Sequence, residues 1–165
     1  PLSRQDPSHW DVELIEQGER LLHPAHALQR PGRFQIEAAL QSGQVARRLD
    51  GTTDWLALLQ LHEALLAHAP SLGAQVATIA CLAQVHGPAQ ALARWEALEQ
   101  ADPIAWRRFQ PASATRADLL YRLGRFEDAA LAFGKAASLT VDAAMRAYLL
   151  KRSQDCRESR PREPC

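Results

Sequence analysis

Histidine and carboxylate side chains recur in this sequence at spacings that could hold a metal ion. Glu19, His23 and His26 stand at i, i+4 and i+7, so they would share one face of a helix. Imidazole and carboxylate groups are common zinc ligands. However, Pro24 lies between them, and no second helix supplies a further set of ligands. We therefore predict three polar surface side chains and no metal.

The other reactive patterns are incomplete. His62 and Glu63 begin like the His-Glu-x-x-His motif of zinc proteases, but Leu66 stands where the second histidine belongs. The sequence has no glycine-rich phosphate loop, nucleophile elbow or cysteine-histidine signature. These gaps predict a protein that is not an enzyme and that uses no cofactor.

The composition predicts a single, mainly helical domain. The chain has 165 residues, of which 47% are apolar, and alanine and leucine dominate. The 19 basic residues equal the 19 acidic ones, whereas a nucleic-acid-binding module normally has a net basic surface. No apolar run is long enough to cross a membrane. We therefore expect no direct contact of this chain with nucleic acid or membrane.

The three cysteines follow no disulfide or zinc pattern, which favours a reducing cytoplasm. Cys81 lies in the apolar run VATIACLAQV and is expected in the core. Cys165 ends a charged, proline-rich tail, residues 157–165, that is expected to be disordered. Because the chain begins with proline, we expect it to be a piece of a longer or processed protein.

Helix signals run along the whole chain. Ser8 and Asp11 resemble a capping box at the start of HWDVELIEQGERLL, and Pro24 is expected to kink or divide that helix. Thr53 or Asp54 can cap a later helix, WLALLQLHEALLAHA.

A repeat relates these helices. HEALLAHAP at 62–70 is similar to WEALEQADP at 95–103, an offset of 33 residues. Ala91 and Trp95 correspond to Ala129 and Phe133 of the next unit, at an offset of 38 residues. Periods of this size are typical of helical solenoids, and we predict a right-handed array of about four helical hairpins.

Small and aromatic residues mark the hairpin contacts. Alanines are expected to let paired helices approach closely, glycines to end first helices in a left-handed cap, and aromatic rings to fill space between hairpins. The predicted repeat positions are Ala80, Gly87, Ala91, Trp95, Ala117, Gly124, Phe126, Ala129, Phe133 and Ala136.

The last unit resembles the tetratricopeptide repeat. Its pattern G-x-[YF]-x-x-A-x-x-x-[YF]-x-x-A is matched by Gly124, Phe126, Ala129, Phe133 and Ala136. The resemblance implies an all-α superhelix of tetratricopeptide type over residues 1–156.

Five blocks in order extend the resemblance over nearly the whole chain: QDPSHWD, RPGRFQIEAAL, TDW, VHGPAQAL and TRADLLYRLGRFEDAALAF. Together they resemble the C-terminal extension of extracytoplasmic-function-type bacterial RNA polymerase sigma factors. The chain departs from that family at Ala77 and Thr78, where the family generally has Asn-Arg, and at Ser113, where a histidine is common. Polar contacts that depend on these positions would be lost or moved here.

The resemblance implies a cytoplasmic protein-interaction domain that regulates transcription initiation. Its implied partners are the sigma factor's own DNA-binding regions, RNA polymerase or a regulator. Neither the stimulus nor the sign of regulation follows from it. The polar residues within or beside the family blocks are our candidates for the interaction surface: Arg33, Gln35, Glu37, Arg116, Asp118 and Arg122.

Two alternatives remain open. One is a free-standing adaptor that binds a peptide in a groove of the array. The other is a small-molecule sensor or lipid binder, which we would expect to contain an enclosed apolar cavity lined by tryptophans.

Overall fold

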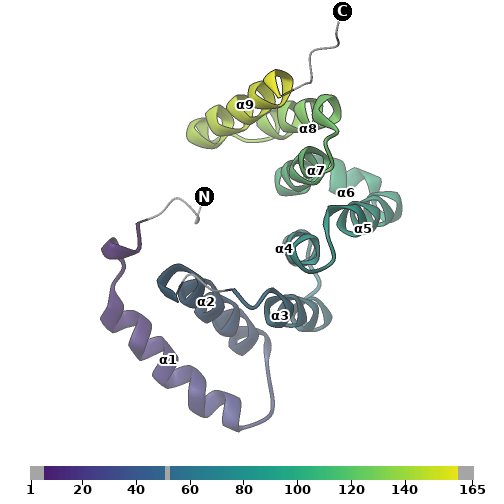
Figure 1. Cartoon of the computed structure of the whole chain (residues 1–165). Coiled ribbons are helices and arrows are strands. Elements are labelled where there is room, and N and C mark those ends of the chain that lie inside the picture. The colour runs from purple at the N-terminus through teal and green to yellow at the C-terminus, as the bar shows by residue number, and fades with distance from the viewer. Residues whose placement is uncertain (1–5, 51–52, 160–165) are drawn as a thin grey trace, which may run out of the picture. The chain divides into compact units, whose positions relative to one another are not determined.

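The computed structural model of the chain describes residues 6–50 and 53–159. Within these ranges the regular structure consists of a short 3-10 helix, Pro7–His9, and nine α-helices, with no strand (Figure 1). The prediction of an all-α helical hairpin array is confirmed. The described residues divide after Pro70 into two compact units, whereas the composition had favoured a single domain.

The first unit contains α1 (Val12–Ala27), α2 (Arg33–Asp50) and α3 (Trp55–His68). Asp11 is the N-cap of α1, and its carboxylate accepts a hydrogen bond from the backbone N–H of Leu14 at 3.0 Å. The predicted capping box at Ser8 is therefore wrong, because Asp11 lies closer to the first helical residue and satisfies its free N–H groups. Pro24 does not divide α1, because the helix continues through it to Ala27.

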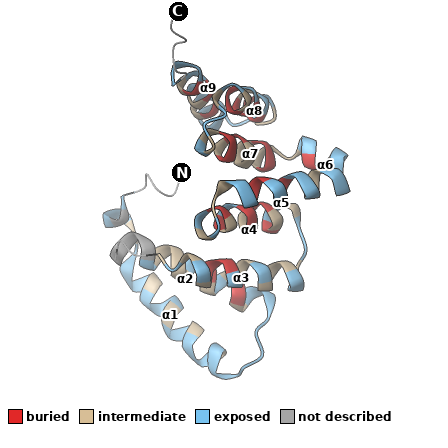
Figure 2. Ribbon diagram, turned by 45° about the vertical axis from the view of Figure 1, so that its right-hand side comes forward, coloured by how far each residue is buried: buried red, intermediate tan, exposed pale blue. Residues whose placement is uncertain are grey.

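The core of the first unit lies between α2 and α3. Ile36 and Leu40 on α2, and Leu58 and Leu59 on α3, are buried. Asp54 caps α3, as predicted, by accepting from the N–H of Ala57 at 2.9 Å. By contrast, α1 has no buried residue (Figure 2).

The second unit is built from two hairpins and a final helix. Helices α4 and α5 form the first hairpin, α7 and α8 form the second, and α9 packs on α8; α7 also contacts both α4 and α5. The helices are α4 (Leu72–Val85), α5 (Pro88–Ala101), α6 (Pro103–Arg108), α7 (Gln110–Arg122), α8 (Phe126–Ser138) and α9 (Ala143–Glu158). Because α9 continues to Glu158, the predicted start of a disordered tail at residue 157 is wrong, and residues 160–165 lie outside the described range.

Small residues line the helix contacts of the second unit. Ala91, Ala117, Ala129 and Ala136 are all 0% exposed, as expected of residues at helix contacts. Ala80 is different: it is exposed. The 3.6-residue period of α4 turns Val76, Ile79 and Ala83 into the core and leaves Ala80 on the surface. The prediction for Ala80 is corrected accordingly.

Gly124 ends α7 as predicted. Its φ is +75°, and the N–H of Arg125 donates to the carbonyl of Leu120 at 2.9 Å, while the N–H of Gly124 donates to Tyr121 at 3.0 Å. These two bonds form a Schellman motif, which requires a left-handed residue at this position.

Gly87 has a different role from the one predicted. Helix α4 ends with His86 as its C-cap, and Gly87 is the N-cap of α5, with φ 87° and ψ 164°. Its φ is positive, but its ψ is extended, so it does not form the left-handed helical cap that we expected.

The aromatic positions also differ from one another. Trp95 and Phe133 are buried, whereas Phe126 is only half-buried. The ring of Phe126 meets Tyr121 edge-on, with centroids 5.5 Å apart. Phe126 thus packs across the turn of its own hairpin, which corrects its predicted place between hairpins.

Cys81 is buried, as predicted, and Cys156 is buried as well. Burial raises the pKa of the Cys156 thiol. Cys165 lies outside the described residues.

Candidate functional site

A groove of about 460 Å³ lies in the second unit, between α4, α7 and α9. Three alanines, Ala80, Ala83 and Ala114, contribute to its lining. Such small side chains leave room for the larger side chains of a partner. Ala80, which sequence analysis assigned to a helix contact, is therefore part of a surface that another molecule can reach.

Arg152 of α9 holds one side of the groove. Its Nη2 lies 3.4 Å from Oδ1 of Asp118, and its Nη1 donates to the hydroxyl of Tyr148 at 3.2 Å. The guanidinium also lies over the rings of Tyr121 and Phe133, 5.3 and 4.7 Å from their centroids. Burial lowers the pKa of Arg152, but its interactions with Tyr148 and Asp118 outweigh this effect and raise the pKa overall. Arg152 is therefore a fixed positive charge that joins α9 to α7.

Arg122 holds the other side. Its Nη2 donates to the backbone carbonyl of Ala83 at 2.8 Å, which joins α7 to α4. Two of the predicted surface residues, Asp118 and Arg122, thus lie together in the groove. Both are also used within the fold, so the walls of the groove are held by specific polar contacts.

The third candidate on α7, Arg116, does not line this groove. Its guanidinium lies over the ring of Trp95 on α5, 5.1 Å from the centroid. Its Nε is buried and has no hydrogen-bond partner among the described residues. Arg116 therefore packs on α5, as a cation-π partner of the core.

The remaining three candidates, Arg33, Gln35 and Glu37, belong to α2 in the first unit. Arg33 Nε and Glu37 Oε1 form an ion pair at 2.9 Å on an exposed surface, an arrangement that contributes little to stability. Gln35 is half-buried and lines a separate pocket of the first unit.

The positions where the sequence departs from the family pattern lie within helices of the second unit. Thr78 donates its hydroxyl to the carbonyl of Ala74 at 2.8 Å, Ala77 is half-buried, and Ser113 is buried. None of the three lines the groove.

The groove is also lined by four polar residues that the sequence patterns did not predict: Gln84, Gln110, Tyr148 and Arg152. Tyr148 and Arg152 both belong to the final helix, α9. The spacing of Tyr148 and Arg152, one helical turn apart, was the available signal.

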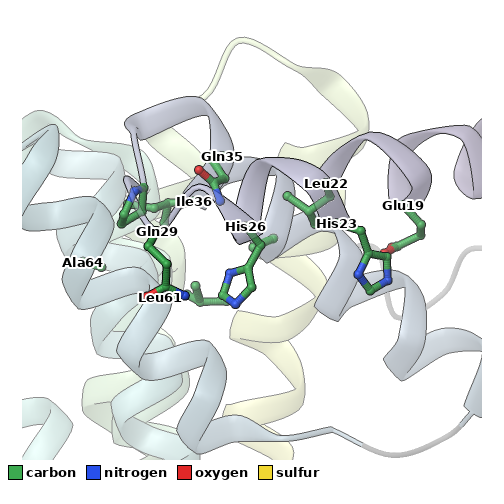
Figure 3. Close-up of a pocket in the computed structure, with 11 residues that line it drawn as sticks. Glu19, Leu22, His23, His26, Gln29, Gln35, Ile36, Leu61 and Ala64 are labelled. Atoms are coloured by element: carbon green, nitrogen blue, oxygen red, sulfur yellow. The ribbon is translucent and has the colours of Figure 1, made fainter.

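The predicted metal candidates do gather on one side of α1. Glu19, His23 and His26 line a pocket of the first unit (Figure 3). In the part of the chain that the structure describes, however, no group of three or more histidine, cysteine, aspartate or glutamate side chains is arranged to hold a metal ion. Within the same ranges, every helix is too short or too polar to traverse a lipid bilayer.

A curated bacterial protein is similar to the chain. An uncharacterized protein of Rhizobium meliloti (strain 1021) is 28% identical over 148 residues, which is 90% of this chain and 34% of that protein. The chain thus spans about a third of the length of the curated relative that it matches. No family model matches the chain, and no solved structure matches it.

Proposed function

We propose that the chain is the C-terminal tetratricopeptide-like extension of an extracytoplasmic-function-type sigma factor, and that its second unit docks a protein segment during transcription initiation. The observation that supports this proposal is the groove between α4, α7 and α9. Its walls come from successive hairpins of the array, an arrangement that presents an extended surface to a partner. The five sequence blocks that resemble the family supply the transcriptional context.

Docking is the mechanism that the groove suits best. The bonds from Arg122 to Ala83 and from Arg152 to Asp118 hold the walls in place, so little ordering is needed when a partner binds. Gln84, with an exposed side chain in the groove lining, can donate and accept hydrogen bonds. A partner that enters or leaves this groove would change how the sigma factor engages the polymerase.

Catalysis is not part of the proposal. The carboxylate that lines the groove, Asp118, is engaged by Arg152.

The test blocks the groove without touching its polar contacts. Ala80→Arg places a long charged side chain in the groove from an exposed helical position, and Ala93→Arg makes the same change at an exposed position of α5 outside it. Binding of each variant to the separately purified DNA-binding regions of the matching sigma factor is measured by a quantitative pull-down. We expect Ala80→Arg to weaken binding by at least about tenfold and Ala93→Arg to leave it unchanged.

Equal binding by the two variants would show that the groove is not the docking site. If the unmodified chain does not bind the DNA-binding regions either, these regions are not its partner. Reading the gene upstream of residue 1 gives an independent test, because the proposal requires a promoter-reading helix-turn-helix there.

A further inference from the structure

The first unit contains a pocket of about 470 Å³ between α1, α2 and α3. This volume falls within the range of small-molecule sites, roughly 300–1,000 Å³. Ile36 and Ala39 of α2 and Leu61 and Ala64 of α3 give it an apolar lining. No lining residue is a tryptophan, so the pocket differs from the cavity that the sensor alternative had led us to expect.

The carboxylate and the two imidazoles of the pocket lie along α1, and the amides of Gln29 and Gln35 also line it. Glu19, His23 and His26 extend from the same side of this helix, and Figure 3 shows Glu19 and His23 at one end of the pocket and Leu61 and Ala64 at the other. The helix rises about 10 Å between Glu19 and His26. The pocket is therefore elongated, with the carboxylate of Glu19 at one end and the side chains of Leu61 and Ala64 at the other.

The inner face of α1 is incompletely packed. No residue of α1 is buried, and Leu22, which lines the pocket, is only half-buried. A molecule in the pocket would cover apolar surface on all three helices of the unit at once. Removing this surface from water is the main free-energy gain available to a ligand.

The charge of the residues that line the pocket determines whether a cationic or an anionic ligand is favoured. Glu19 contributes the carboxylate, and neither lysine nor arginine is among the residues that line the pocket. Arg20, next in sequence, forms an ion pair with Glu16 at 3.6 Å. A cationic donor at the Glu19 end is attracted to this carboxylate, whereas an anionic head is repelled by it.

We propose that the first unit binds a small amphipathic cation. Its apolar body lies over Ile36, Leu61 and Ala64, and its amine head lies at Glu19 and His23. This site is separate from the groove of the second unit, and it adds a ligand to the proposed docking function. The two proposals can fail independently, because their tests use different units and different binding partners.

The first experiment compares two probes with the same tail. Dodecylamine and dodecanoate, both below their micelle concentrations, are titrated into the full chain by calorimetry. We expect dodecylamine to bind at least about tenfold more tightly than dodecanoate. Glu19→Gln should reduce this preference to less than about threefold, while the control Glu13→Gln, in the first turn of α1 and outside the pocket lining, should keep it. Equal affinity for both probes, or an unchanged preference in Glu19→Gln, would overturn the proposal.

The second experiment fills the end of the pocket at Ala64. Ala64→Leu adds volume to the pocket lining, and the control Ala67→Leu adds the same volume at an exposed position of α3. We expect Ala64→Leu to weaken dodecylamine binding by at least about tenfold and Ala67→Leu to have no effect. Equal binding in both variants would show nonspecific adsorption of the alkyl chain. A concentration-dependent dimer in sedimentation that Ala64→Leu abolishes would identify a second copy of the chain as the occupant instead.

Discussion

At the residue scale, Trp95 and Trp106 provide a matched pair. Both are buried, with ring centroids 5.9 Å apart, but only Trp95 has a partner for its indole N–H, the carbonyl of Ala112 at 2.8 Å. The N–H of Trp106 is buried and has no partner among the described residues. Comparing the two therefore isolates the hydrogen bond from the packing.

Trp95→Phe should lower the free energy of unfolding by about 1–3 kcal/mol more than Trp106→Phe. Both substitutions remove similar volume, but the first removes a buried hydrogen bond, whereas the second removes a buried N–H that has no partner among the described residues. Urea unfolding followed by circular dichroism measures the difference. Equal free energies in the two variants would show that the Trp95 bond adds nothing.

His62 links the stability of the first unit to pH. Its Nδ1 is buried without a partner among the described residues, and burial lowers the pKa of the imidazole. Because the folded state then binds a proton less readily than the unfolded state, stability should be full above about pH 6.5 and should fall as the pH drops further.

His62→Gln removes this titration. We expect hydrogen exchange of the α3 amides to accelerate between about pH 7.5 and 5.5 in the unmodified chain, after correction for intrinsic exchange, and to change less in His62→Gln. The same pH dependence in both proteins would assign the effect to other groups.

At the element scale, the turn between α7 and α8 depends on one backbone conformation. An alanine at Gly124 would have to adopt φ near +75°, which is strained for a residue with a Cβ. Gly134, within α8, has ordinary helical geometry, and a Cβ there meets nothing within 4 Å.

Opposite effects are therefore expected at these two glycines. Gly124→Ala should destabilise the chain by about 1–2 kcal/mol, and Gly134→Ala should stabilise it by about 0.5–1 kcal/mol. Thermal unfolding of the two variants beside the unmodified chain measures both shifts. A stabilising Gly124→Ala would contradict the positive φ at this position.

Local patterns were enough to predict the second hairpin. Gly124, Ala129, Phe133 and Ala136 lie within one short stretch, and their periodicity defines two helices and the contact between them. Local patterns failed where two signals stand close together. Asp11, and not Ser8, caps α1, and Pro24 lies near the end of α1 without dividing it. Ala80 was misplaced because offsets between repeats do not give the face of a helix.

The groove could be predicted only in part. Asp118 and Arg122 stand in a recognisable sequence block, but Arg152 reaches Asp118 across 34 positions of the chain. Such a contact depends on how α9 packs, and no local pattern contains that information. The pocket of the first unit was not predicted as a pocket either, although the shared face of Glu19, His23 and His26 was.

At the scale of the whole molecule, the two units differ in the size of their cores. The first unit buries only four apolar side chains, Ile36, Leu40, Leu58 and Leu59, among its described residues. The second unit has a continuous core that extends from Val76 to Cys156 (Figure 2). A repeating sequence does not reveal this difference, because each hairpin has a similar pattern whether or not its neighbours bury it.

The difference in core size predicts that the second unit folds alone. A fragment of residues 71–159 retains every residue of the continuous core, so it should keep its helicity and unfold cooperatively. A fragment of residues 6–70 is short and has a small core, and it should be only marginally stable, by less than about 3–5 kcal/mol. Circular dichroism and urea unfolding of the two fragments measure both outcomes. A non-cooperative transition in 71–159 would show that its core needs the first unit, and the groove would then have to be tested only in the full chain.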